Sequence, residues 1–163
     1  MTMHDHFNVS GMAIQGTLHL IPISGTPDGY ATFETPLEQC ALDAGNEVLG
    51  SAILRAAERC RRVQRREDLG GTDPDDVARS LGYKSDKEIC KRVASVAVSR
   101  RRGETTLIIN ATRPERGIAL FTSDKFEAPI DDPAELGRVV KLAVAISEAN
   151  LLSMLEKRAK RKK

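Results

Sequence analysis

Aromatic residues are scarce in this chain of 163 residues, which has no tryptophan, two tyrosines and four phenylalanines. Proteins that bind single-stranded nucleic acid without sequence preference stack bases on aromatic side chains, so the composition argues against such a platform. A chain of this length still forms one domain with a substantial hydrophobic core. That core must be built from leucine, isoleucine, valine and alanine.

Cysteine and histidine are also few. Cys40, Cys60 and Cys90 are odd in number, widely spaced and outside any CxxC motif, which predicts reduced, packed thiols rather than disulfides. We interpret His4-Asp5-His6 as part of an irregular terminus rather than a metal site, because no third ligand group accompanies it. An unrecognised enzyme remains an alternative, and it requires a deep polar pocket that holds His19 or a cysteine.

Motifs of known enzyme chemistry are absent. The chain has neither of the phosphate-binding patterns GxxxxGK and GxGxxG, no GxSxG nucleophile elbow and no HExxH metal motif. The sequence therefore predicts a protein that is not an enzyme, with no catalytic residues, no cofactor and no metal. It has no secretory signal and no apolar run of transmembrane length, so we expect a cytoplasmic protein.

Charge is distributed unevenly along the chain. Residues 1–54 contain six acidic residues and no lysine or arginine. A surface of one sign attracts a partner of the opposite sign and speeds association, so Glu34, Glu38 and Asp43 are predicted to bind a basic partner. Tyr30 and Tyr83 are the only tyrosines, and each is a predicted interface anchor if it is exposed.

Basic residues gather in three places, at 59–66, at 100–102 and at the C-terminus, where six of the last seven residues are lysine or arginine. They support an alternative function, a nucleic-acid-binding accessory protein that uses the arginine-rich helix end and the basic tail. We expect contact between the tail and nucleic acid to be weak, nonspecific and sensitive to salt.

One short pattern occurs twice, a Leu-Gly pair at the start of an apolar run with helical period. The pairs are Leu49-Gly50 and Leu136-Gly137. Similar segments precede both pairs in the same order, which indicates an internal half-repeat. Glycine costs about 1 kcal/mol in a helix relative to alanine, so each glycine is predicted to allow its helix to approach the sheet closely.

Hydrophobic periodicity predicts the secondary structure. Strands are expected at 12–23, 30–37, 93–99, 105–112 and 118–122, two main helices from Glu47 and from Asp132, and two short helices at 75–81 and 85–92. We predict an α+β fold in which an antiparallel sheet of about five strands packs with these helices. Residues 1–10 are assigned to a mobile terminus, 11–156 to a single domain and 157–163 to a disordered tail.

These features together resemble the CdiI immunity proteins of bacterial contact-dependent growth inhibition systems. The segments that carry the resemblance span most of residues 17–147: Leu20-Ile21-Pro22-Ile23, Leu49-Gly50 with Ile53-Leu54 and Ala56, Leu81-Gly82-Tyr83-Lys84-Ser85, Leu107-Ile108-Ile109, Gly117-Ile118-Ala119-Leu120-Phe121 and Glu135-Leu136-Gly137.

The resemblance implies a cytoplasmic binding protein that neutralises the C-terminal toxin domain of a cognate CdiA effector as a heterodimer. Such toxins are commonly nucleases, and often ones that cleave tRNA. A basic nuclease groove is compatible with the acidic segment described above, whereas the arginine-rich segments and the basic tail depart from simple RNA mimicry.

Overall fold

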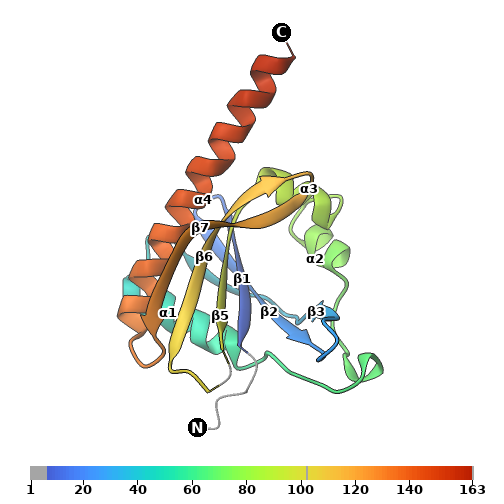
Figure 1. The fold of residues 1–163 in the computed structure, drawn as a ribbon, viewed down its shortest axis with the longest axis vertical. Helices are drawn as coiled ribbons and strands as arrows, with labels where there is room; N and C mark the ends of the chain where they lie inside the picture. The colour runs from blue at the N-terminus through green and yellow to red at the C-terminus, as the bar shows by residue number, and fades with distance from the viewer. Residues whose placement is uncertain (1–6, 102, 163) are drawn as a thin grey trace.

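The computed structural model describes residues 7–101 and 103–162 as a seven-stranded antiparallel sheet with helices against both faces (Figure 1). His4 and His6, Arg102 of the predicted turn and Lys163 of the predicted tail lie outside the described residues. The elements in chain order are β1 (Asn8–Ile14), β2 (Thr17–Gly25), β3 (Ala31–Phe33), β4 (Glu38–Ala41), α1 (Asn46–Ala57), η1 (Arg66–Asp68), α2 (Pro74–Ser80), α3 (Asp86–Arg92), β5 (Ala94–Arg100), β6 (Thr106–Glu115), β7 (Ile118–Pro129) and α4 (Pro133–Arg161). The predicted α+β class is confirmed, with more strands than expected.

The strand order has the symmetry that the sequence repeat predicts. Strands β1 and β5 pair at the centre, β2 and β6 flank them, and the outer positions hold β3 and β4 on one side and β7 on the other. Each half of the chain thus runs through three strand positions and ends in a long helix. The two halves meet at the antiparallel pair of β1 and β5, with the later strands of each half in order on either side.

The two Leu-Gly helices pack against each other, and this corrects one prediction. A Cβ added to Gly50 would lie 1.8 Å from the carbonyl oxygen of Pro133, and one added to Gly137 would lie 1.8 Å from the carbonyl oxygen of Asn46. The glycines therefore allow close contact between the starts of α1 and α4, not between a helix and the sheet as the sequence suggested. Any larger residue would force the helices apart.

Two cores lie on opposite faces of the sheet. Alternating side chains of β1 send Val9 toward α1 and α4 but Met12 toward α2 and α3. The larger core is aliphatic, as the composition predicts, and its fully buried members include Leu18, Leu20, Leu49, Ile53, Leu107, Ile109 and Leu136.

The first predicted strand is two strands. The segment 12–23 is broken by a tight turn at Gln15 and Gly16, whose φ angles are 49° and 78°, and residues 8–10, assigned to a mobile terminus, belong to β1. Positive φ at both turn positions is typical of a two-residue hairpin, but glutamine gives no turn signal at the first of them. The next predicted strand, 30–37, is a strand only at Ala31–Phe33, because the chain then leaves the sheet and returns to it as β4 from Glu38.

The C-terminal tail is helical where the sequence predicts disorder. Helix α4 continues to Arg161, and Figure 1 shows its second half projecting beyond the sheet. Lysine and arginine are good helix formers, and their charges are favourable near a helix C-terminus, so a helix already nucleated in the core extends through them.

Helix capping follows the sequence signals in three of the four α-helices. Asp73, Ser85 and Asp132 accept backbone N–H bonds at the starts of α2, α3 and α4. Helix α1 has no side-chain cap, because its N-cap is Gly45.

Candidate partner-binding surfaces

The acidic segment and the arginine-rich segment lie against each other. Arg61 binds Glu34 at 3.1 Å, Arg55 binds Glu38 at 2.9 Å, and Arg66 binds Asp28 at 2.9 Å. In sequence these groups form two separate charged regions, one of each sign. In the fold they neutralise each other pair by pair, which weakens the one-sign surface expected of either region.

Backbone contacts hold this arrangement in place. The chain after α1 runs beside the end of β2, where the Gly25 N–H donates to the Arg61 carbonyl at 2.9 Å and the Val63 N–H donates to the Gly25 carbonyl at 3.1 Å. The Ser24 hydroxyl accepts from the Arg61 N–H at 2.8 Å. Residues 61–63 therefore run along the end of β2, whereas Arg59 lies in the turn after α1 and Arg66 begins η1. The arginine-rich segment is thus not the helix end that the sequence predicted.

The five predicted contact residues are dispersed. Tyr30 is 47% exposed, and the Arg66 guanidinium lies 4.9 Å from its ring centroid. Asp43 is exposed in the turn before α1, and among the described residues it forms no ion pair. Tyr83 is half-buried against the α2–α3 core, while Glu34 and Glu38 are held by arginines.

Titration shifts follow from these contacts. The pKa of Asp28 is lowered, first by the hydrogen bond from the Thr26 hydroxyl and then by that from Arg66. The pKa of Asp86 is raised because the group is partly buried and faces the carboxylates of Asp75 and Asp73. The pKa of His19 is lowered by burial. The charge of Asp86 also acts on Cys90 and, after burial, helps to raise the pKa of that thiol.

The cysteines are free thiols, as predicted. Cys60 is fully buried and its thiol donates to the Asn8 carbonyl at 3.0 Å. Burial raises the pKa of the Cys40 and Cys60 thiols, and it raises that of Cys90 to about 11. Thiolate is the reactive form of cysteine, so these environments keep the thiols unreactive at neutral pH. Within residues 7–101 and 103–162, no three His, Cys, Asp or Glu side chains are arranged to hold a metal ion.

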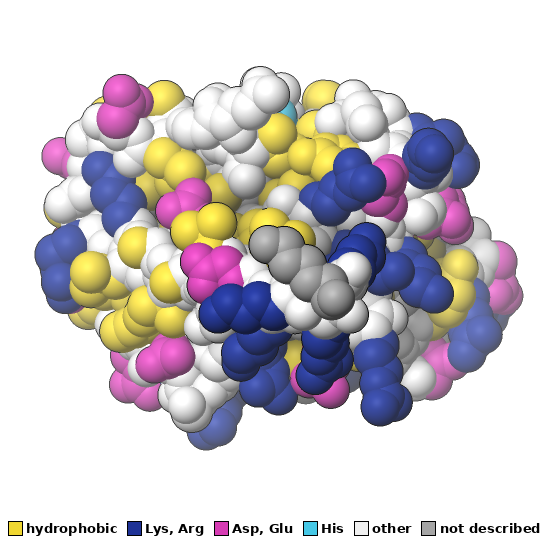
Figure 2. All heavy atoms as spheres, turned by 90° about the horizontal axis from the view of Figure 1, so that it is seen from above, with side chains coloured by type: hydrophobic (Ala, Val, Ile, Leu, Met, Phe, Trp, Pro, Cys, Tyr) yellow, Lys and Arg dark blue, Asp and Glu magenta, His cyan; other side chains and the backbone are white. Residues whose placement is uncertain are grey.

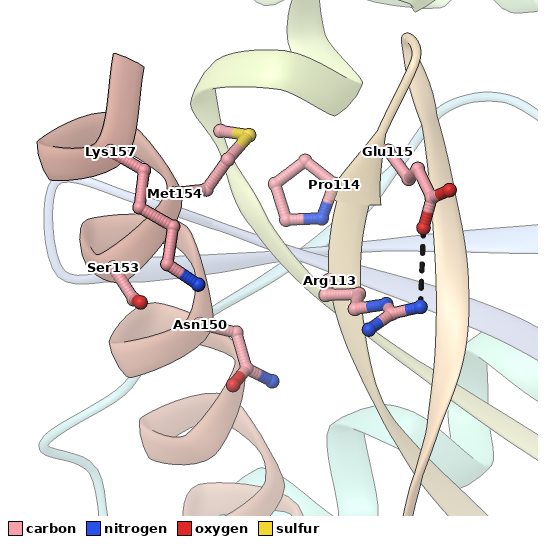
Figure 3. Close-up of a pocket in the computed structure, with 7 residues that line it drawn as sticks. All are labelled: Arg113, Pro114, Glu115, Asn150, Ser153, Met154 and Lys157. Atoms are coloured by element: carbon pink, nitrogen blue, oxygen red, sulfur yellow. Dashed lines mark hydrogen bonds and ion pairs between the residues drawn. The ribbon is translucent and has the colours of Figure 1, made fainter. Parts of the chain in front are cut away.

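A groove that sequence reasoning missed lies where α4 leaves the sheet. It has a volume of about 270 Å³ between α4 and the end of the β6–β7 hairpin (Figure 3), and its lining consists of Arg113, Pro114, Glu115, Asn150, Ser153, Met154 and Lys157. Arg113 pairs with Glu115, two residues further along β6, at 3.2 Å. The sequence feature that could have indicated this groove is the apolar stripe of α4. The stripe continues through Leu151 and Leu155, beyond the part of the helix that the sheet covers.

An irregularity in the pairing of β6 with β7 lies where α4 leaves the sheet. The β6–β7 register shifts between Asn110 and Thr112. The Thr112 N–H donates to the buried Ser147 hydroxyl at 2.9 Å, and the Asn150 amide donates to the Thr112 carbonyl at 3.2 Å. Bulges leave backbone groups without ladder partners, and here α4 supplies the partners.

The end of the molecule to which α4 projects is basic. Figure 2 looks at this end and shows lysine and arginine side chains gathered around the helix, with hydrophobic side chains exposed beside them. The described basic residues of the helix end are Lys157, Arg158, Lys160, Arg161 and Lys162, all exposed. Of the helices in the described part of the chain, none combines the length and the apolar character needed to cross a membrane.

Comparison with known proteins gives a likeness in fold. The chain matches a protein of unknown function from Neisseria meningitidis with a TM-score of 0.69 and 21% identity, over 89% of this chain and 97% of that one. It also matches a chain of the CdiA-CT/CdiI toxin and immunity complex from Yersinia pseudotuberculosis, with a TM-score of 0.60 and 17% identity, over 86% of this chain and 96% of that one. No family model and no curated protein matches the sequence.

Proposed function

We propose that this protein is an immunity protein, which binds a toxin domain and neutralises it without catalysing a reaction. The observation that carries the proposal is the fold shared over 86% of the chain with a member of a toxin and immunity complex. Most of the segments that resemble CdiI in sequence fall on the sheet and on helices α1 and α4, and the segment from Leu81 to Ser85 forms the connection between α2 and α3. The proposed partner is the C-terminal toxin domain of a CdiA effector, bound in the cytoplasm as a heterodimer, and the proposed toxin activity is that of a nuclease acting on tRNA.

The contact residues first predicted are part of this proposal. Tyr30 and Asp43 are the most accessible of them, and an exposed tyrosine is a frequent interface anchor. Glu34 and Glu38 contribute through their ion pairs with arginine, which a basic toxin would have to rearrange on binding. Tyr83 contributes by its exposed part only, since the rest packs against the protein's own core.

The test is a protection assay with the product of the neighbouring effector gene. The C-terminal domain of that effector is expressed alone, with this protein, and with this protein unfolded by the substitution Gly50→Leu. The proposal requires growth arrest in the first and third cases, growth in the second, and a one-to-one complex on purification.

Two results contradict the proposal. Growth arrest that persists when the intact protein is present removes the immunity role. Growth arrest by this protein alone reverses the roles, since the matched chain then corresponds to a toxin. If nucleic acid co-purifies through a high-salt wash and no protein partner does, the result supports the nucleic-acid-binding alternative. That alternative now depends mainly on the basic C-terminal end of α4, because Arg61 and Arg66 are paired with acidic residues.

A further inference from the structure

The second half of α4 carries an apolar stripe that the sheet does not cover. The side of α4 that is buried through Ser147 continues with Leu151 and Met154, which are half-exposed, and with Leu155, which is 42% exposed. Met154 lies in the lining of the groove beside the β6–β7 hairpin, and in Figure 3 its side chain lies on the side of α4 near Pro114. The groove thus has an apolar floor made by Met154 and Pro114.

The end of α4 beside this groove is positive. Lys157 lines the groove, and Arg158, Lys160 and Arg161 follow it on α4, with Lys162 as the C-cap; we call these five residues the rim. Across the described residues, none of these five side chains forms an ion pair, whereas Arg113 on the opposite side is already paired with Glu115. Glu156 is the one acidic residue among residues 150–163. The uncompensated charge is therefore available to a partner.

We infer that this groove binds an acidic, apolar segment of the protein partner. This inference rests on the proposed function only in taking the toxin as the partner. The chemistry of the site is argued from the groove itself. The apolar floor takes a leucine-like side chain of the segment, and the lysines and arginines of the rim take its carboxylates. A toxin held in this way would be docked through an acidic surface, outside any basic groove for nucleic acid.

Charge and composition favour this occupant over two others. A second copy of the chain would bring two strongly positive helix ends together, which is electrostatically unfavourable. Nucleic acid would satisfy the positive rim but would leave Met154 and Leu155 without an apolar partner, and the groove lining offers no aromatic side chain on which a base can stack.

The test uses the full chain with three variants. Met154→Asp places a charge on the floor. The rim variant combines Lys157→Glu, Arg158→Glu and Arg161→Glu. The matched control combines Arg62→Glu, Arg65→Glu and Arg101→Glu, three exposed arginines that form no ion pair within the described residues. Because all these positions are at least partly exposed, unfolding midpoints are expected to match that of the unmodified protein, and circular dichroism checks this.

The probes are the toxin domain, a short labelled peptide of alternating glutamate and leucine, the same peptide with lysine in place of glutamate, and a single-stranded RNA. We expect the acidic peptide and the toxin to bind the unmodified protein and the control alike, and to lose at least about tenfold in affinity for the floor and rim variants, about 1.4 kcal/mol. The basic peptide should not bind.

The outcomes separate this inference from the proposed function. If the toxin binds all variants equally, the groove is not its binding site, and the immunity role is unaffected. If the toxin does not bind the unmodified protein but the acidic peptide shows the expected pattern, the immunity role is wrong, and the groove is still a site for acidic, apolar segments. Three further results would each overturn the inference. The first is that Met154→Asp leaves the affinity for the acidic peptide unchanged. The second is that RNA binds more tightly than the acidic peptide and depends on the rim, and the third is that the protein forms a dimer which Met154→Asp dissociates.

Discussion

Gly50 of α1 lies against the carbonyl group of Pro133 at the start of α4, so closely that a Cβ on Gly50 would sit 1.8 Å from the carbonyl oxygen. The contact is repeated with the helices exchanged, since Gly137 of α4 meets the carbonyl of Asn46 in the same way. This reciprocal contact joins the two halves of the chain through their helices. Strands β1 and β5 join them through the sheet.

The first prediction concerns this contact. Gly50→Ala and Gly137→Ala should each lower the free energy of unfolding by at least about 3 kcal/mol, because the clash is with backbone that cannot rotate away. Gly70→Ala is the matched control, since Gly70 lies in an exposed loop and has nothing within 4 Å of an added Cβ. Urea unfolding measures all three, and loss of stability in the control alone would contradict the packing argument.

The second prediction concerns the hydrogen bond between Thr112 of β6 and Ser147 of α4, beside the irregularity in the β6–β7 pairing. Ser147 is 1% exposed, and its hydroxyl accepts the Thr112 N–H and donates to the Ala143 carbonyl. Ser147→Ala leaves a buried N–H without an acceptor, which should cost about 1–3 kcal/mol. Ser153→Ala, at an exposed position of the same helix, should change stability by less than about 0.5 kcal/mol. Equal effects would mean that the hydrogen bond contributes nothing.

The third prediction is a pH dependence from Cys90. Its folded pKa is about 11 against an ordinary value of 9.0, so the folded state holds the proton more tightly than the unfolded state does. The contribution to stability is complete below pH 9 and is lost as the pH rises toward about 11. Urea midpoints measured across this range should fall less steeply for Cys90→Ala. At pH 8, iodoacetamide should modify Cys90 slowly in the folded protein and quickly in denaturant.

The fourth prediction concerns the ion pairs of the acidic segment. Glu34→Gln and Glu38→Gln should each change stability by less than about 1 kcal/mol, because both partner arginines are substantially exposed. Asp43→Lys should leave stability unchanged and slow association with a basic toxin at low salt, an effect that stopped-flow measurements detect. If all three substitutions leave the association rate and its salt dependence unchanged, the contact proposal for the acidic segment is wrong.

Local chemistry determined much of the fold directly. Asp132 followed by Pro133 begins α4, Ser85 begins α3, and the alternation in 93–99 gives β5, because these signals depend on contacts within a few residues. The repeated Leu-Gly pair also predicted two equivalent halves. It did not predict what the glycines contact, because that depends on how α1 and α4 cross after folding.

Tertiary structure decided the candidate sites. In the sequence, Glu34 is far from Arg61 and Glu38 is far from Arg55, so their charges were assigned to two surfaces of opposite sign. The packing of α1 against β4, and the path of residues 61–63 beside the end of β2, bring them together as pairs. The sequence shows that the apolar stripe of α4 runs on to Leu155, but only the fold determines where the sheet stops and leaves Met154 beside an open groove. Charge and periodicity are properties of the chain, but compensation and exposure are fixed by which segments the fold makes neighbours.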